Sequence, residues 1–193
     1  MTTTTTTPTA TPSITGDYAI DATHSRIGFV ARHAMVTKVR GSFNEFEGSG
    51  HFDPDDASKI SLSLTISSAS IDTRNADRDA HLKSNDFLDM DRFPTISFRS
   101  TSVELATTGD YRVTGELTIK GVTRTVTIDF SYEGAATDPY GNFRIGLEGS
   151  TTINRRDWGV SWNAALEAGG VLVSEKVTLE FEVSAVRQGP PEA

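Results

Sequence analysis

The stretch that decides the fold is YRVTGELTIKGVTRTVTIDF, residues 111–130, in which apolar and polar side chains alternate on both sides of Lys120 and Gly121. A two-residue turn at these positions predicts a β-hairpin, because such a turn fixes which residues of the two strands face each other. The predicted partners are Ile119 with Val122, Leu117 with Arg124, Gly115 with Val126, Val113 with Ile128 and Tyr111 with Phe130. One face of the hairpin is then almost purely apolar, and the other carries Thr and Asp side chains that belong in water.

Gly115 interrupts the apolar face of this hairpin. If Tyr132 pairs with Phe143 on the next strand, Gly149 comes opposite Val126, so that Val126 has a glycine on both sides. A sheet that curls with its apolar face inward and lacks side chains at such points can enclose a cavity. The alternative, left open by the sequence, is that the glycines relieve strain where the sheet bends.

Further segments show the same alternation, and with the hairpin they give about eight strands, a number that closes into a barrel able to hold side chains or one small ligand. The segments are residues 18–32, 39–52, 60–66, 95–105, 143–153 and 171–186. The alternation changes phase near Asn44 and near Ser100, which predicts a bulge at each point. Residues 71–93 break the pattern with dense charge, so we expect one or two short helices there, the second beginning at Ser84.

The composition narrows the class of function. The chain of 193 residues has no cysteine, which excludes disulfides, thiolate metal sites and thiol catalysis. A formal net charge of -8 argues against a nucleic-acid partner, which needs a clustered basic face. The 4 histidines lack the spacing of a local metal motif, so we expect no metal site.

The ends of the chain set the expected domain bounds. Residues 1–16 are rich in Thr and Pro with no apolar period, and predict a disordered tail. We expect the barrel to span residues 17–187 and a C-terminal tail to follow at 188–193. The start lacks the positive charge and apolar core of a secretory signal, and no later stretch is apolar enough to span a bilayer, so we expect a cytoplasmic protein.

Several independent blocks, in this order along the chain, resemble the YceI-like family of lipocalin-type proteins. The blocks are IDATHSRIGFVARH (20–33), VRGSFNEFEG (39–48), SIDTRNADRDAHLKSNDFLDMDRFPTISF (70–98), VTGELTIKGVTRTV (113–126) and INRRDWG (153–159). The resemblance implies an all-β fold, a single extended antiparallel eight-stranded lipocalin-like barrel with a short helical insert. It also implies an apolar tunnel that takes the chain of a polyisoprenoid, such as a quinone tail or a polyprenyl phosphate.

The predicted tunnel lining comes from the inward positions of the strands, where an alkyl chain loses its contact with water at about 0.8 kcal/mol per CH2. The lining residues are Phe29, Phe43, Leu64, Ile66, Phe98, Val113, Gly115, Leu117, Val126, Ile128, Phe130, Ile145, Leu147 and Gly149. The alternative is that these side chains simply pack on one another.

Two polar blocks of the family pattern are candidates for holding a ligand headgroup. They comprise Arg78, Asp79 and His81 in the insert, and Asn154, Arg155, Asp157 and Trp158 after the strand that ends at Ile153. Arg78 or Arg155 would bond phosphate or carbonyl oxygens. The alternative is a structural network that ties the insert and the following loop to the end of the barrel.

The predicted function is non-catalytic binding, storage or transport of a long-chain isoprenoid, either a polyprenyl phosphate or an isoprenoid quinone, or of a similar lipid. We expect no catalytic residue and no cofactor besides that lipid. Two alternatives stay open: an enzyme acting on such a lipid with His24, His33 or Asp79 as acid or base, and a stress or interaction module with a fully packed barrel. A transient membrane contact and a homodimer also stay open; a closed barrel has no exposed edge, so a dimer would use loops or the outer wall.

Overall fold

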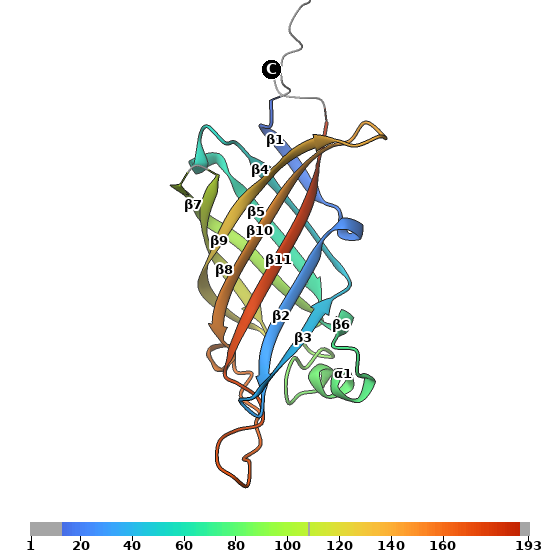
Figure 1. The fold of residues 1–193 in the computed structure, drawn as a ribbon, viewed down its shortest axis with the longest axis vertical. Helices are drawn as coiled ribbons and strands as arrows, with labels where there is room; N and C mark the ends of the chain where they lie inside the picture. The colour runs from blue at the N-terminus through green and yellow to red at the C-terminus, as the bar shows by residue number, and fades with distance from the viewer. Residues whose placement is uncertain (1–12, 108, 190–193) are drawn as a thin grey trace, which may run out of the picture.

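The computed structural model describes residues 13–107 and 109–189, and there the strands pair into one antiparallel sheet that closes on itself (Figure 1). The strands are β1 (Gly16–Ile20), β2 (Arg26–His33), β3 (Thr37–Phe43), β4 (Phe46–Phe52), β5 (Ser61–Ser67), β6 (Ile71–Asp72), β7 (Thr95–Thr107), β8 (Asp110–Ile119), β9 (Val122–Thr137), β10 (Phe143–Asn154) and β11 (Lys176–Arg187). The helical elements are α1 (Ala76–Lys83) and the short 3-10 turns η1 (Ala22–His24), η2 (Ala57–Lys59), η3 (Ser68–Ser70) and η4 (Arg155–Trp158).

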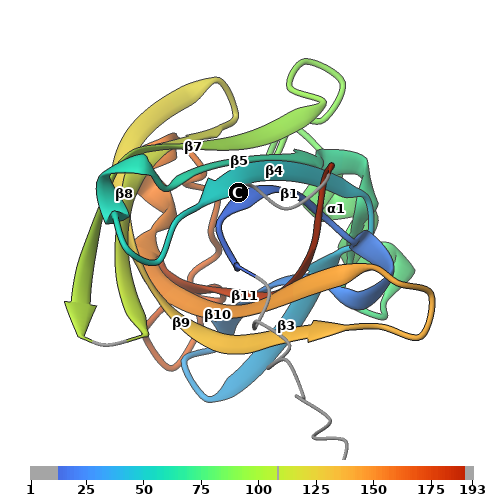
Figure 2. The same ribbon diagram turned by 90° about the horizontal axis from the view of Figure 1, so that it is seen from above.

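The sheet closes because β11 pairs with β10 on one side and with both β1 and β2 on the other. β1 and β2 are therefore two halves of one barrel strand, interrupted by η1. In the same way β3 continues into β4, and β5 continues through η3 into β6. Counted like this, the barrel has 8 antiparallel strands, which confirms the predicted fold class. Seen from above in Figure 2, the strands form a ring.

The hairpin of β8 and β9 has the predicted register throughout, from Ile119 opposite Val122 to Tyr111 opposite Phe130. Its turn has positive backbone angles at both central residues, with φ of 49° at Lys120 and 73° at Gly121. This is the turn geometry whose twist matches that of the two strands. The two predicted irregularities are confirmed as well: the chain leaves the ladder between Phe43 and Phe46, and the register of β7 shifts after Ser100.

The predicted register of β9 with β10 is wrong. Tyr132 lies opposite Leu147 rather than Phe143, and Gly149 lies opposite Phe130 rather than Val126. The reason is that β9 continues to Thr137, so the strands are joined later than we expected, and a bulge at Gly146 and Leu147 shifts the pairing once more.

Three smaller expectations also need correction. The expected first strand, 18–32, is broken by η1, where the Asp21 side chain accepts a hydrogen bond from the Thr23 amide. In the described insert α1 is the α-helix, and Ser84 ends it instead of starting a second one. Residues 13–16 belong to the barrel end rather than to the tail, because Ile14 packs against the core and Gly16 begins β1. The rest of the predicted tail, residues 1–12, lies outside the described residues.

The two ends of the barrel differ, and this difference positions the site. We call the end that carries α1 the lower end and the end near the chain termini the upper end (Figure 1). The lower end holds the β2–β3 turn, the β8–β9 turn, the insert at 73–94 and the segment 155–175 that leads into β11. Buried apolar side chains fill the barrel between the ends, with Ile128 at 2% exposure near its middle.

Candidate functional site

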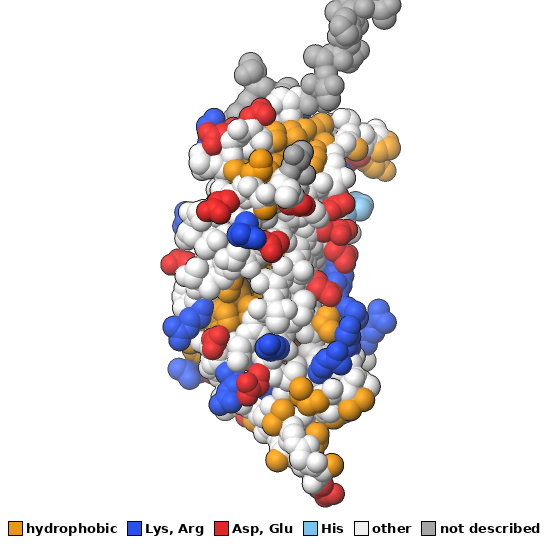
Figure 3. Space-filling model, turned by 60° about the vertical axis from the view of Figure 1, so that its left-hand side comes forward, with side chains coloured by type: hydrophobic (Ala, Val, Ile, Leu, Met, Phe, Trp, Pro, Cys, Tyr) orange, Lys and Arg blue, Asp and Glu red, His pale blue; other side chains and the backbone are white. Residues whose placement is uncertain are grey.

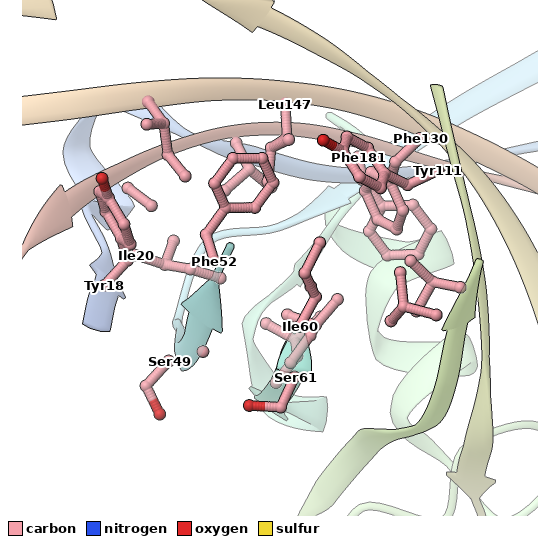
Figure 4. Close-up of a pocket in the computed structure, with 18 of the residues that line it drawn as sticks. Tyr18, Ile20, Ser49, Phe52, Ile60, Ser61, Tyr111, Phe130, Leu147 and Phe181 are labelled. Carbon is pink, nitrogen blue, oxygen red and sulfur yellow. The ribbon is translucent and has the colours of Figure 1, made fainter. Parts of the chain in front are cut away.

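The barrel interior contains two apolar chambers along its axis. The upper chamber has a volume of about 80 Å³ and the lower one about 160 Å³. Both chambers are therefore small, and nearly all of their lining side chains are apolar. The strands alternate, so every second side chain points into this space, as Figure 4 shows for Phe52, Phe130 and Leu147 in the upper chamber.

The upper chamber lies among β1, β4, β8, β9, β10 and β11. Its walls include Tyr18, Phe52, Tyr111 and Phe130, which Figure 4 labels, and also Ala185. Phe52 stands edge-on to Tyr111 at 5.5 Å between ring centres. Burial raises the pKa of both tyrosines above its ordinary value, so their hydroxyls stay neutral at physiological pH.

The lower chamber extends the same space toward the insert. Its walls combine barrel side chains such as Phe29 and Leu179 with Leu82 and Phe87 from the insert. Five residues line both chambers and form a waist between them: Ile27, Leu64, Phe98, Ile128 and Phe181. The two chambers are therefore neighbouring parts of one bore, separated by these side chains.

Most of the predicted lining residues lie in these chambers. Phe29, Phe43, Ile66 and Leu117 line the lower chamber, Val113, Phe130, Ile145 and Leu147 the upper one, and Leu64, Phe98 and Ile128 both. Val126 is buried in the core but lines neither chamber, and neither do Gly115 and Gly149.

The glycines leave room for aromatic rings rather than for a cavity. A Cβ atom on Gly115 would lie 2.5 Å from Cζ of Phe98, and one on Gly149 would lie 2.5 Å from Cδ1 of Phe130. The ring of Phe29 lies over Gly41 in the same way, since a Cβ atom on Gly41 would lie 2.3 Å from Cζ of Phe29. Each phenylalanine lies over the glycine of a neighbouring strand, so its ring stays against the barrel wall. The prediction that Gly115 and Gly149 mark the cavity is thus wrong, because a ring occupies each gap.

Arg155 is the basic side chain that lines the lower chamber. It is only 6% exposed, and its guanidinium donates to the carbonyl oxygens of Ser174, Val160 and Val173 at 2.9, 2.6 and 3.3 Å. In the described chain no carboxylate forms an ion pair with Arg155. The Glu175 carboxylate attracts the guanidinium electrostatically, but its own ion pair is with Arg156 at 2.8 Å. Burial lowers the pKa of the guanidinium, which nevertheless remains charged. A positive charge therefore borders the apolar chamber; its hydrogen bonds go to three main-chain carbonyls, and the Glu175 carboxylate attracts it without forming an ion pair.

The other predicted residues of the insert form a structural network. The Asp79 carboxylate accepts from the amide and the hydroxyl of Thr73, at 2.9 and 2.5 Å. Arg78 donates through Nε to the Thr73 hydroxyl and through its terminal nitrogen to the Thr73 carbonyl, both at 2.7 Å. These bonds hold the start of the insert against the end of β6, and neither side chain lines a chamber.

His81 belongs to an aromatic cluster that joins the insert to the segment after η4. Its ring stands edge-on to Trp162 at 4.5 Å and to Phe87 at 5.1 Å, and its Nε2 lies 2.8 Å from the Asp86 carboxylate. Phe87 in turn lines the lower chamber and lies 5.8 Å from the Arg155 guanidinium. The cluster thus reaches the bore through Phe87 and forms part of its lower closure, whereas His81 and Trp162 line neither chamber.

The remaining predicted headgroup residues position η4. Asn154 caps it by accepting from the Arg156 amide at 3.1 Å, and the buried Trp158 donates to the Leu117 carbonyl at 2.9 Å. Asp157 is exposed, and its main-chain carbonyl accepts from Arg124 at 3.1 Å. Of the seven predicted headgroup residues, the structure therefore places Arg155 in the wall of the bore, with the others supporting the elements around it.

Sequence reasoning missed part of the wall. Ile27, Tyr18 and Phe52 line the bore but were not among the predicted residues, although the alternation of their strands already pointed them inward. Leu82 and Phe87 were missed because an irregular insert has no period that assigns a direction. The described residues contain no cluster of His, Asp or Glu that could hold a metal ion. None of the helices described is long and apolar enough to cross a membrane.

Comparisons with known proteins agree with this architecture. The model of a family described as the YceI-like domain matches residues 18–185. A UPF0312 protein of Staphylococcus aureus is 39% identical over 170 residues, which cover 88% of this chain and 95% of that protein. The crystal structure of BcnA from Burkholderia cenocepacia matches with a TM-score of 0.76 and 25% identity, covering 86% of this chain and 98% of BcnA.

A more distant structure shares the fold. It is a polyisoprenoid binding domain from Saccharophagus degradans implicated in plant cell wall breakdown, with a TM-score of 0.66 and 17% identity. The match covers 89% of this chain and 98% of that domain.

Proposed function

Because the chain belongs to the YceI-like family, we propose that its barrel binds one long isoprenoid chain, or a similar lipid tail, and stores or carries it without chemical change. The observation that carries this proposal is the pair of apolar chambers that meet at a shared waist of apolar side chains. We infer that a flexible chain passes from one chamber to the other when the waist side chains turn aside. The Saccharophagus degradans domain supports this ligand class, since it is described as polyisoprenoid binding.

The energetics favour a long chain. Each CH2 group that leaves water contributes about 0.8 kcal/mol, so a chain that reaches from the lower chamber into the upper one gains more than a chain that fills one chamber. Besides its packed side chains the interior contains the two chambers, which supports a binding protein over a packed interaction module. Tail binding of this kind needs no cofactor, and we propose none besides the lipid.

We place the polar head of the ligand at Arg155. The guanidinium has five N–H groups, and its three hydrogen bonds to carbonyls use one N–H group each. The remaining N–H groups can donate to a phosphate or carbonyl oxygen of the ligand. A polyprenyl phosphate or an isoprenoid quinone would then lie with its headgroup in the lower chamber and its tail extending into the upper chamber.

An enzymatic role receives less support. His24 is bonded to Asp21, His33 is the exposed last residue of β2, and Asp79 is bonded to Thr73. None of these three predicted acids or bases lines a chamber. General acid–base catalysis requires such a group within hydrogen-bond reach of the reacting atoms. We therefore propose binding without catalysis.

Organic extraction of the purified full-length protein followed by mass spectrometry tests this function. We expect a long-chain isoprenoid or another single-tailed lipid at one molecule per protein. The lipid-free protein should then bind a long polyprenol more tightly than farnesol, because only the longer chain reaches both chambers. Protein that carries no lipid and binds neither alcohol would refute the proposal.

A further inference from the structure

The β2–β3 turn at the lower end exposes apolar side chains to solvent. The turn is closed by a hydrogen bond from the Val36 amide to the His33 carbonyl at 3.0 Å. Met35 is 51% exposed and Val36 75%, and both belong to the few large apolar side chains that the described structure leaves this open. Such exposure has a cost in a protein that works in water alone, so it points to a contact surface.

The backbone of this turn has a conformation that its residues, Ala34 and Met35, rarely adopt. Ala34 and Met35 both have left-handed angles, with φ of 50° and 59°. Asn and Gly adopt this geometry at much lower cost than Ala and Met. At the neighbouring β8–β9 turn the second of the two positions is indeed a glycine, Gly121. A strained turn that keeps an exposed Met is a signature of function rather than of folding.

A second hairpin adjoins the first and extends the apolar tip. Leu172 donates its amide to the Ala164 carbonyl at 2.9 Å, and Leu166 donates to the Gly170 carbonyl at 3.1 Å, so residues 164–172 fold back on themselves. Ala34 donates to the Leu172 carbonyl at 2.7 Å and ties the two tips together. We define the apolar rim as Met35, Val36, Leu166, Val171 and Leu172. Figure 3 shows apolar side chains gathered at this end of the molecule.

Basic side chains surround the apolar rim. Arg32, Lys38 and Lys176 are exposed, and in the described structure no carboxylate forms an ion pair with them. Two further arginines are paired, Arg40 with Glu180 at 3.2 Å and Arg156 with Glu175 at 2.8 Å.

The acid at the tip itself is Glu167. Figure 3 shows Lys and Arg side chains gathered above the apolar end. The whole chain has a formal net charge of -8, so this end is a local exception to an acidic protein.

We propose that the apolar rim docks on the surface of a bilayer that contains anionic lipids. Two convex tips with separate apolar side chains can insert among lipid headgroups. The rim residues Met35 and Val171 share the hollow beside these tips with Lys38 and Lys176, so basic and apolar side chains lie together at this end. The basic side chains above the rim then meet the lipid phosphates, and the acidic remainder of the molecule is repelled, so only this end turns toward the membrane.

The docked orientation would place the bore at the membrane. Val173 and Ser174, whose carbonyls hold Arg155, follow directly after the rim residue Leu172. The lower chamber therefore lies next to the docked surface, and we expect a lipid to enter from this side with its head at Arg155. This consequence rests on the proposed function, but docking itself does not require that the bore binds lipid.

Co-sedimentation of the full-length protein with vesicles tests the proposal. We expect binding to vesicles of phosphatidylcholine with phosphatidylglycerol, weaker binding to phosphatidylcholine alone, and loss of the difference in high salt. Met35→Ser with Val36→Ser should weaken binding by about tenfold. Leu105→Ser is the matched control, because Leu105 is 53% exposed but lies at the upper end, and this variant should bind like the original protein.

Two further variants separate docking from folding. Ala34→Asn with Met35→Gly relieves the strained turn, so it should raise the thermal stability while it weakens vesicle binding. Lys38→Glu with Lys176→Glu should abolish the preference for anionic vesicles. Failure of the original protein to bind anionic vesicles, or equal binding by the Met35 and Val36 variant, would overturn docking whether or not the bore yields a lipid. If the original protein is a dimer that does not bind vesicles, and the Met35 and Val36 variant is a monomer, the rim binds a second copy of this chain. That result would also overturn the docking proposal.

Discussion

Filling the upper chamber should convert the protein from a binder of long chains into a binder of short ones. Ala185 on β11 is 5% exposed and lines the upper chamber but not the lower one. In the variant Ala185→Phe the ring would occupy space that we assign to the ligand tail. If the ring displaces about four CH2 groups, at about 0.8 kcal/mol each, the loss is roughly 3 kcal/mol, or about 200-fold in affinity. A short chain that fills only the lower chamber should lose almost nothing.

Competition against a fluorescent fatty acid or polyene probe, with farnesol and a long polyprenol as competitors, measures this difference. Ala136→Phe is the control, since Ala136 is exposed on β9 and adds the same ring outside the barrel. Ala31→Phe, in the lower chamber, should weaken both competitors, because the head end of every ligand would be blocked. Equal weakening of the short and the long alcohol in Ala185→Phe would refute the placement of the tail in the upper chamber.

Three other predictions follow from the contacts. Gly115→Ala should lower the free energy of unfolding by about 1–3 kcal/mol in urea titration, because its Cβ would lie 2.4 Å from the Arg99 carbonyl oxygen, a main-chain atom that cannot turn away; an unchanged midpoint would contradict this. Arg144→Met should destabilise the protein at pH 7 and much less near pH 2. Hydrogen bonds from Thr23 and then Arg144 hold the pKa of Asp21 well below its ordinary value. The stabilisation by this pair is therefore present above about pH 4 and is lost as the pH falls toward the lowered pKa. A difference in urea midpoint that does not change with pH would show that the ion pair contributes nothing. Arg155→Met should lower the free energy of unfolding by roughly 2–5 kcal/mol, because it leaves three carbonyls without donors. In the folded variant, the affinity for a polyprenyl phosphate should fall more than the affinity for the matching polyprenol. If both affinities fall equally, Arg155 does not bind the headgroup.

The fold was predictable wherever a short turn fixed the register. Lys120 and Gly121 leave one pairing for β8 and β9, and every partner from Ile119 to Tyr111 follows from it. The β9–β10 pairing failed because Gly134 lies in a stretch without alternation, so the sequence does not show where the strand ends. A shift of a few residues there was enough to bring Gly149 opposite Phe130 instead of Val126.

The site was predictable in its chemistry and less so in its details. Alternation identifies which side of a strand faces inward, and this placed Phe98, Ile128 and Leu147 in the wall. It cannot show that a ring such as that of Phe98 leans sideways over Gly115, because this contact depends on the side-chain rotamer and on the neighbouring strand. The family pattern pointed to a group of polar residues, but only the three-dimensional structure separates Arg155, which faces the bore, from Arg78, which holds Thr73.

Two arginines of this barrel differ in how their charge is balanced. Arg144 at the upper end is partly buried and is balanced by two carboxylates, Asp21 at 2.5 Å and Asp138 at 2.8 Å. Arg155 is buried more deeply, where an unpaired charge costs more, and its hydrogen-bond partners are three neutral carbonyls. The carboxylate that acts on Arg155 electrostatically, Glu175, is bonded to Arg156 instead. Under the function that we propose, a phosphate head in the lower chamber would pair with the Arg155 guanidinium, and the interaction would be strong because the apolar walls exclude water. The same charge would repel a cationic head, so we expect the protein to bind an anionic head in preference to a cationic one.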